Sequence, residues 1–331
     1  MARVCFFARV PDRAVLDRIE FYAQDLAILR ELGHDVTVAT RASELVRADL
    51  YFCWWWTWAF LPLAAARLSG RPAVVTGVFD EWMFDARPWP QRALLRRALG
   101  AADVNLFVSE LEHRIVPARF RVRRPRYAPC AVDAQRYSPG PGAPRERFLL
   151  TVAWLGADNA RRKGIPELVR ALPSILRRHP DVRWVHCGEQ GSGFAAIRDL
   201  AESLGVAHAV EFRGVVSREE KIALMQRCAA FVQPSRYEGF GLAVLEAMAC
   251  GAPVVASRGG ALPEVVGDAG VLVNGVEPEA IAAGVCTTLD DPTRAASLGA
   301  RARARAATLF TLQRRREGIA DAIAAAMAAR R

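Results

Sequence analysis

Two glutamates, Glu238 and Glu246, stand in the otherwise small and apolar stretch RYEGFGLAVLEAMACGAPVVAS (236–257). A carboxylate in such surroundings is costly unless a polar group meets it. The stretch has the pattern of a loop, a helix over about 241–250 and a strand at 252–257. The two carboxylates therefore belong to a loop and to the helix that follows it, and we expect both to meet a polar ligand or a cation.

The glycines of Gly239-Phe240-Gly241 stand where this helix begins. Unpaired backbone N–H groups and the positive end of the helix dipole make a helix N-terminus an anion site. Glycine has no Cβ, so a bulky anion can approach the backbone closely. Glu246 lies one turn beyond Leu242 on the same face, and a carboxylate there could accept ribose hydroxyls. The pattern indicates a nucleotide; the alternative is a helix whose glutamates only cap or pair with arginines.

Cations for an anionic ligand occur in Arg161-Arg162-Lys163-Gly164, just after the first strand of the second half. This is the loop position where phosphates bind in doubly wound folds. Lys163 and Lys221 are the only lysines in the chain. Lys163 could serve as a point charge for a diphosphate, with Arg162 as a neighbouring fork donor. The alternative is an arginine-rich start of a helix.

The elements that position these residues alternate between apolar strands and helical patterns, which predicts parallel sheets with helices on both faces. With 331 residues the chain is longer than one hydrophobic core usually grows. We therefore predict two doubly wound α/β domains, with ligands in the cleft between them at the carboxyl ends of the strands. Strands are expected at 4–10, 34–40, 72–79, 103–109, 148–155, 182–188, 209–214, 229–235 and 252–257, and helices at 19–33, 165–179, 195–205 and 219–228.

The segment Tyr137-Ser138-Pro139-Gly140-Pro141-Gly142-Ala143-Pro144 is the clearest linker, because it is dense in proline and glycine. It places an N-terminal Rossmann-like domain at 1–140 and a C-terminal one at 141–312. The last segment, 313–331, is a strong helix former interrupted only by Gly318, and it could pack back on the N-terminal domain.

Composition narrows the class of protein. The seven cysteines are scattered and include no C-x-x-C pair, which favours a reducing compartment over a disulfide framework or a structural zinc. Arg3, Arg9 and Pro11 break the start of the chain, so no signal peptide is expected. The uncharged run Tyr51–Ala66 is short for a membrane span and is interpreted as a buried strand followed by a helix.

The net charge of +10 comes almost entirely from arginine. It could serve an anionic lipid or a nucleic acid, or it could be a solvated surface. The segments 92–100 and 119–126 make the first half locally basic. The run Trp54-Trp55-Trp56-Thr57-Trp58 could line an acceptor site or form a buried corner between a strand and a helix.

The second half resembles the nucleotide-binding domain of the retaining glycosyltransferases of family 4, which have the GT-B fold of two facing Rossmann-like domains. The resemblance rests on RRKGIPELVRAL, VRWVHCGEQGSG, VEFRGVVS, FVQPSRYEGFGLAVLEAMACGAPVVAS and GGALPEVVGDAGVLV, in that order. ELGHDVTVAT, ADVNLFVSELEHRIV and APCAVDAQRYSP extend it more loosely into the first half.

The resemblance implies that the second domain binds a nucleoside-diphosphate sugar. Glu246 would accept hydrogen bonds from the ribose, Arg162 and Lys163 would hold the diphosphate, and Glu238 would contact the sugar. Phe240, Gly241 and Leu242 would present backbone amides to the sugar and phosphate, and Val215 would lie near the base. The remaining donor-site residues implied in this way are Gly188 and Gly239.

Three departures from the family pattern matter. Ala153-Trp154 replaces a usual Gly-Arg, so the role of the diphosphate arginine falls to Arg162 or Arg161. Phe79-Asp80 replaces a His-Asp pair, which leaves Asp80 as a candidate for contacting the donor sugar or the acceptor. A glycine-rich first loop is missing, so the acceptor side is undefined by sequence.

The sequence thus predicts a metal-independent, cofactor-free hexosyltransferase that acts with retention on a saccharide or lipid-linked acceptor in cell-surface glycan synthesis. We expect it in the cytoplasm, with peripheral contact to the anionic inner face of the membrane as a further possibility. One rival is a GT-B scaffold that has lost activity. A second rival is a basic nucleic-acid-binding protein, but no recognised module and no interleaving of aromatic with basic residues supports it; nucleic acid is not expected as a partner. A sugar-nucleotide epimerase would need a general acid/base pair that is not found.

Overall fold

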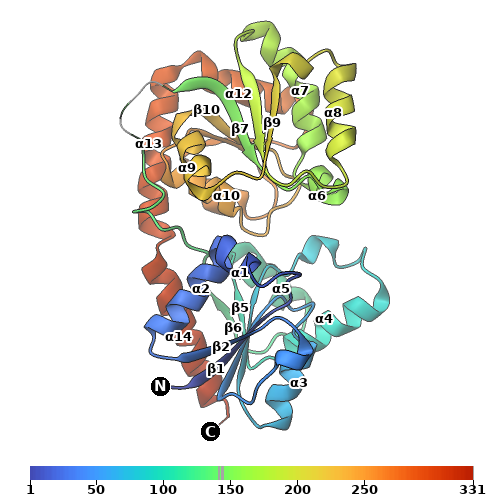
Figure 1. The fold of residues 1–331 in the computed structure, drawn as a ribbon, viewed down its shortest axis with the longest axis vertical. Helices are drawn as coiled ribbons and strands as arrows, with labels where there is room; N and C mark the ends of the chain where they lie inside the picture. Colours follow the sequence, from blue (N-terminus) through green and yellow to red (C-terminus); the bar gives the residue numbers. More distant parts are fainter. Residues whose placement is uncertain (141, 143–144, 331) are drawn as a thin grey trace. The chain divides into compact units, whose positions relative to one another are not determined.

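The computed structural model describes residues 1–140, 142 and 145–330. Within them the chain forms two compact units (Figure 1). Unit 1 comprises Met1–Ala131 and Leu312–Arg331, and unit 2 comprises Val132–Thr311. Each unit is built on its own six-stranded parallel sheet, so the predicted α/β class with two Rossmann-like domains is confirmed.

The sheet of unit 1 has the strand order β2-β1-β3-β4-β5-β6. The four inner strands β1, β3, β4 and β5 are almost fully buried, as expected when helices cover both sides of a parallel sheet, whereas the edge strands β2 and β6 are partly exposed. The strands are β1 (Arg3–Ala8), β2 (Asp35–Ala39), β3 (Leu50–Trp54), β4 (Ala73–Gly77), β5 (Val104–Phe107) and β6 (Pro125–Tyr127).

Helices of unit 1 cover the two faces of this sheet. One face packs against α3, α4 and α5 through a core that includes Phe7, Cys53 and Leu99. The other carries α2 and the C-terminal helix α14, which lie side by side (Figure 1). The helices are α1 (Val15–Arg18), α2 (Glu20–Glu31), α3 (Phe60–Leu68), α4 (Trp89–Ala101), α5 (Glu110–Arg119) and α14 (Leu312–Ala328), with 3-10 turns η1 (Ala42–Glu44) and η2 (Glu81–Met83).

A buried ion pair attaches α14 to unit 1. Nε and Nη2 of Arg315 donate to the two carboxylate oxygens of Asp25 on α2, at 2.9 and 2.7 Å. Nη1 donates to the carbonyl of Ala128 at 2.8 Å, and Nη2 also donates to Oγ1 of Thr76 at 3.2 Å. Gly318 serves the same packing, because a Cβ there would lie 2.3 Å from the Cβ of Ala128.

The sheet of unit 2 has the order β12-β11-β10-β7-β8-β9. Its strands are β7 (Glu146–Val152), β8 (Arg183–Cys187), β9 (Val210–Gly214), β10 (Cys228–Gln233), β11 (Val254–Ser257) and β12 (Val271–Val273). The helices α7, α8 and α12 pack on one face around a core that includes Leu168, Trp184 and Ile281. The helices of unit 2 are α6 (Ala157–Arg162), α7 (Ile165–Arg178), α8 (Phe194–Ser203), α9 (Arg218–Arg227), α10 (Leu242–Ala249), α11 (Leu262–Val266), α12 (Pro278–Asp290) and α13 (Pro292–Leu309), with the 3-10 turn η3 (Ala207–Ala209).

The two units meet a few residues before the 140/141 division expected from the linker, because the segment before the linker packs in unit 2. Val132 forms a parallel bridge with Thr311, and Arg303 on α13 donates to the carbonyls of Ala134 and Tyr137, both at 2.7 Å. Unit 2 accordingly spans 132–311 rather than 141–312. The linker residues 141, 143 and 144 lie outside the described residues.

The tryptophan run divides between core and surface. Trp54 and Trp56 are buried, and Nε1 of Trp56 donates to Asn105 at 2.7 Å. Trp58 keeps 46% of its surface exposed. The interpretation as a buried corner therefore holds for two of the tryptophans and leaves Trp58 available to a ligand.

Candidate functional site

The candidate site lies at the carboxyl ends of β7 and β10 in unit 2, where the loops carrying Lys163 and Glu238 meet. Gly164 has a φ of +66°, and a Cβ at that position would stand 2.0 Å from the carbonyl oxygen of Pro234. The backbone N–H of Arg236 also donates to the carbonyl of Arg162 at 2.8 Å. A glycine and a backbone hydrogen bond therefore hold the two loops together.

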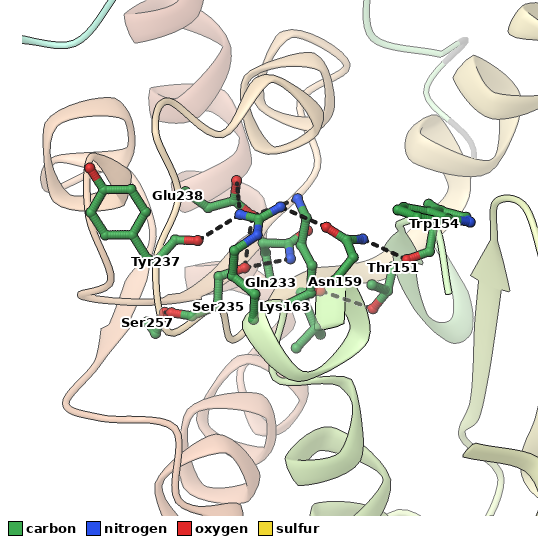
Figure 2. Close-up of polar contacts among 11 residues, drawn as sticks. Thr151, Trp154, Asn159, Lys163, Gln233, Ser235, Tyr237, Glu238 and Ser257 are labelled. Carbon is green, nitrogen blue, oxygen red and sulfur yellow. Dashed lines mark hydrogen bonds and ion pairs between the residues drawn. The ribbon is translucent and has the colours of Figure 1, made fainter. Parts of the chain in front are cut away.

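Glu238 is buried at the centre of this contact (Figure 2). Nζ of Lys163 lies 2.5 Å from its Oε1, and the hydroxyl of Ser235 donates to the same oxygen at 2.8 Å. Nη1 of Arg162 lies 3.5 Å from Oε2. The structure thus brings together three predicted site residues, Arg162, Lys163 and Glu238.

Charge keeps the Glu238 carboxylate ionised. Burial by itself would raise the pKa of Glu238, but the charges of Lys163 and Arg162 and the hydrogen bonds from Lys163 and Ser235 together outweigh it and hold the pKa below its ordinary value. One carboxylate faces two cations, so the cluster retains an excess positive charge. An anion placed beside it would be stabilised.

Arg162 is oriented by a chain of hydrogen bonds. Its Nη1 donates to the carbonyl of Tyr237 at 2.8 Å, and its Nη2 donates to Oδ1 of Asn159 at 2.7 Å. Nδ2 of Asn159 donates in turn to the carbonyl of Trp154 at 2.6 Å. Arg161 instead pairs with Asp158 and has a side chain that is 72% exposed. Of the two arginines left open by the sequence, Arg162 is the one in the cluster.

The helix α10 begins next to this cluster, as the sequence predicts. Its N-cap is Gly241, with a φ of 98° that disfavours residues with a side chain. Phe240 is buried and packs edge-on against Phe310, with ring centroids 5.6 Å apart. Phe240 can therefore offer a ligand its backbone but not its ring, and Gly239 and Leu242 flank it at the start of the helix.

Glu246 is buried on α10, and Nζ of Lys221 on α9 donates to its Oε2 at 2.8 Å. The ammonium of Lys221 also lies 5.2 Å from the ring centroid of Tyr137. Each glutamate of the opening stretch is thus paired with one of the two lysines in the chain. The sequence singled out Lys221 only as a rare residue, and its partner was missed.

Gly188 and Val215 lie at the ends of the neighbouring strands β8 and β9. The N–H of Gly188 donates to the carbonyl of Gly214 at 2.7 Å. Gly188 has a φ of 140°, and a Cβ there would stand 1.9 Å from the carbonyl oxygen of Ala153. This glycine is required by the close approach of β7 and β8, and Val215 beside it is well exposed.

Asp80 belongs to unit 1 and adopts a left-handed backbone conformation with φ 55°. The buried carboxylate of Glu112 holds this turn by accepting the backbone N–H groups of Phe79 and Asp80 at 2.8 and 2.9 Å. The side chain of Asp80 lies 3.8 Å from Arg87. The sequence did not predict this role of Glu112, because a single glutamate within a helix has no distinctive pattern.

Sequence reasoning also missed the residues that support Glu238. Nε2 of Gln233 donates to the hydroxyl of Ser235 at 2.8 Å, which fixes the serine that holds the carboxylate. The glycines Gly259 and Gly260 pack on the same loop, where Cβ atoms would stand 2.1 Å from the carbonyl of Ser235 and 2.2 Å from that of Glu238. Their position in the quoted GGALPEVV segment was the available signal.

Residues 1–140, 142 and 145–330 contain no group of three or more His, Cys, Asp or Glu side chains placed to hold a metal ion. The helices within the same ranges are too short or too polar to cross a membrane.

The chain is similar in sequence and in fold to known proteins. Residues 146–305 match the family model described as glycosyl transferases group 1. A GDP-mannose-dependent alpha-(1-6)-phosphatidylinositol monomannoside mannosyltransferase of Mycolicibacterium smegmatis is 34% identical over 282 residues, which cover 80% of this chain and 74% of the relative. A D-inositol 3-phosphate glycosyltransferase of Streptomyces avermitilis is 38% identical over 174 residues, covering 50% of this chain and 37% of the relative.

Solved structures share the fold. Sucrose-phosphate synthase from Thermosynechococcus elongatus superposes with a TM-score of 0.80 at 19% identity, over 97% of this chain and 98% of that one. HepE of Anabaena in complex with UDP-glucose superposes with a TM-score of 0.78 at 19% identity, over 98% and 100% of the two chains. The fold of the chain is the GT-B fold of these enzymes.

Proposed function

This chain belongs to the group 1 glycosyl transferases, and we propose that it transfers a sugar from a nucleoside-diphosphate sugar to a saccharide or lipid-linked acceptor. The observation that carries the proposal is the excess positive charge of Arg162 and Lys163 around Glu238, next to the N-terminus of α10. The reaction builds negative charge on the leaving nucleoside diphosphate, and preorganised cations and N–H groups stabilise such charge.

In this proposal each part of the donor meets a different element of unit 2. The diphosphate binds Lys163 and Arg162, and the ribose hydroxyls donate to Glu246. The transferred sugar contacts Glu238 and the backbone at the start of α10. The base lies near Gly188 and Val215, at the ends of β8 and β9. Asp80 of unit 1 contacts the transferred sugar or the acceptor.

Retention of configuration and independence of metal are parts of the same proposal. A cation pair and a helix N-terminus perform the charge stabilisation for which other transferases use a metal ion. The carboxylate of Glu238 is already bonded to Lys163 and Ser235, which suits a positioning role better than a nucleophilic one. We propose front-face attack by the acceptor rather than a double displacement.

The relatives suggest the acceptor and the place of action. The name of the Mycolicibacterium relative includes a phosphatidylinositol monomannoside and GDP-mannose. We propose that the acceptor is a glycolipid of the cell envelope and that the donor is a nucleoside-diphosphate sugar with a purine or pyrimidine base. Unit 1 exposes Trp82, Met83 and Trp89 near the arginines of α4. Aromatic and basic side chains together favour the surface of an anionic membrane, so we propose peripheral attachment to its cytoplasmic face.

A thermal-shift screen tests the donor. GDP, UDP, GDP-mannose and UDP-glucose are each added to the full chain, with and without EDTA. A ligand at 100 times its dissociation constant stabilises the folded state by about 2.7 kcal/mol. We expect one base to raise the melting temperature, EDTA to have no effect, and Lys163→Ala and Glu246→Ala to reduce the shift strongly.

The exposed Arg161→Ala is the matched control and should leave the shift intact. A chain that no nucleotide stabilises, or that duplex DNA stabilises instead in a strongly salt-dependent way, would falsify the proposal.

A further inference from the structure

Residues that follow three neighbouring strands of unit 1 line one pocket. Arg9 directly follows β1, Arg41 stands two residues beyond β2 and Trp58 four residues beyond β3. In the order β2-β1-β3-β4-β5-β6 these strands are adjacent. Parallel strands bring their carboxyl ends to the same edge of the sheet, so the three side chains converge there.

This edge is also where the order of the strands reverses. β1 pairs with β2 on one side and with β3 on the other, so the connections leave in opposite directions and open a crevice between them. Ligands of open α/β sheets bind at such a switch point. The pocket there has a volume of about 300 Å³ and is lined by Arg9, Val10, Pro11, Arg41 and Trp58.

The lining is cationic and aromatic. The guanidinium carbon of Arg9 lies 6.0 Å from the ring centroid of Trp58, and Nη1 of Arg9 donates to the carbonyl of Thr40 at 3.4 Å. Glu44, the acidic residue nearest to Arg41 in the sequence, has its Oε2 bonded to the N–H and hydroxyl of Thr40 at 2.7 and 3.1 Å. Hydrogen bonds from Thr40 and, as a smaller effect, the charge of Arg41 lower the pKa of Glu44. In the part of the chain that the structure describes, neither Arg9 nor Arg41 forms an ion pair.

The chemistry of these groups defines a ligand. Two guanidinium forks from different strands match an anion with several acceptor oxygens, such as a phosphate, better than a carboxylate that one fork would satisfy. An exposed indole presents a flat apolar face, on which the C–H face of a sugar or cyclitol ring can stack. Val10 and Pro11 add apolar contact beside it.

We propose that this pocket binds the acceptor through a phosphate group held by Arg9 and Arg41, with the ring that carries the phosphate stacked on Trp58. The assignment rests on the proposed function, since it makes the ligand of unit 1 the acceptor of the transfer. A soluble sugar or cyclitol phosphate and the headgroup of a phospholipid share this chemistry. The pocket selects phosphorylated over unphosphorylated rings of the same size.

The test measures binding to the full chain by isothermal titration, with four probes. They are inositol 3-phosphate, glucose 6-phosphate, unphosphorylated inositol, and vesicles of phosphatidylcholine that contain phosphatidylinositol. We expect phosphate-bearing probes to bind and inositol not to bind. If only the vesicles bind, the source is the lipid headgroup; if the soluble phosphates bind too, the phosphate and its ring suffice.

The variants Arg9→Gln and Arg41→Gln each remove one exposed guanidinium and should weaken binding of the phosphate-bearing probe about tenfold. Trp58→Leu should weaken it by a smaller factor. Arg30→Gln on α2 is the matched control, an exposed arginine of the same unit outside the pocket, and should bind as the wild type does.

Equal binding by Arg9→Gln, Arg41→Gln and Arg30→Gln overturns the inference, as does a wild-type chain that binds no phosphate-bearing probe. The nucleotide-induced rise in melting temperature separates this outcome from failure of the proposed function. Suppose that the nucleotide still raises the melting temperature of the wild type and of the pocket variants, but that the substitutions do not change the affinity for the phosphate-bearing probe. The proposed donor site is then retained, and only the assignment of the pocket is wrong.

Discussion

Asp25 in unit 1 and Glu238 in unit 2 are both buried carboxylates that face a cation, but their surroundings differ. Arg315 meets Asp25 with two parallel hydrogen bonds and directs its remaining donors at Ala128 and Thr76. Both side chains of that pair are about 2% exposed. One charge balances one charge there, and every nitrogen of the guanidinium bonds within the protein.

The cluster around Glu238 is not balanced in this way. One carboxylate faces Lys163 and Arg162, and these cations keep 14% and 27% of their side chains exposed. We call Arg315–Asp25 the closed pair, and Glu238 with Lys163 and Arg162 the open cluster. The closed pair holds α14 in place, whereas the open cluster can bind an anion without first breaking all its own bonds. Burial of an ion pair therefore indicates structure, and an excess charge with partial exposure indicates a binding site.

The largest effect is expected from opening the closed pair. Arg315→Met leaves the charge of Asp25 buried without its partner, which should lower the free energy of unfolding by about 3–5 kcal/mol. Urea denaturation followed by circular dichroism measures the loss. Removing both charges in Arg315→Met/Asp25→Leu should recover part of it. A single variant that loses less than about 1 kcal/mol would contradict a structural role for this pair.

The second largest effect is expected from acid, which should lower the free energy of unfolding of unit 2. Burial lowers the pKa of His186 to about 4, so between its ordinary value of about 6.5 and 4 the unfolded chain binds more protons than the folded one. Neutral His186 makes its full contribution to the free energy of unfolding above pH 6.5. The free energy of unfolding should then fall by about 3 kcal/mol by pH 4. The lowered pKa of Glu238 adds a further loss below pH of about 4.3. Denaturation at a series of pH values measures this slope.

His186→Phe provides the check on that slope. His186 packs near Trp184 and Phe212, with ring centroids 5.8 and 5.9 Å away, so an aromatic ring without a titrating nitrogen suits the position. The variant should lose less stability than the wild type between pH 6.5 and 4. An unchanged slope would show that another group accounts for it.

Breaking the open cluster should affect binding more than stability. Lys163→Met removes one of the two cations that face Glu238, and Arg162 and Ser235 still contact its carboxylate. The loss of stability should therefore be smaller than in Arg315→Met, while the affinity for a nucleoside diphosphate should fall about 30-fold, or about 2 kcal/mol. Titration calorimetry measures the affinity. Arg161→Met, which removes an exposed charge from the same loop, should bind normally. If both variants bind alike, the excess charge is not specific to the cluster.

The smallest effect is expected at Lys221, which touches Glu246 and not the diphosphate in our proposal. Lys221→Met should weaken binding about tenfold and reduce the preference for ribonucleoside over deoxyribonucleoside diphosphates, because Glu246 would lose the bond that orients it. Arg227→Met removes a cation from the same helix, where it pairs with Glu146 at 2.6 Å, and should preserve that preference. Equal discrimination in the two variants would remove Lys221 from the site.

Much of the fold followed from local pattern. The periodicity of apolar residues located most strands and the helix α10, because a strand buried on both faces and a helix begun by glycines leave signals within ten residues. The short strands β6 and β12 gave no such signal. The motif around Glu238 and Glu246 and the scarcity of lysine pointed to the candidate site residues without any structure.

What the tertiary structure decided was which of these residues meet. Arg162 rather than Arg161 contacts Glu238, each lysine pairs with one glutamate, and Arg315 reaches Asp25 across a separation of 290 residues. Trp58 departs from its buried neighbours, and Val132–Gly140 belongs with unit 2. Such outcomes depend on the packing of distant segments, and sequence periodicity reports only which face of its own element a residue occupies.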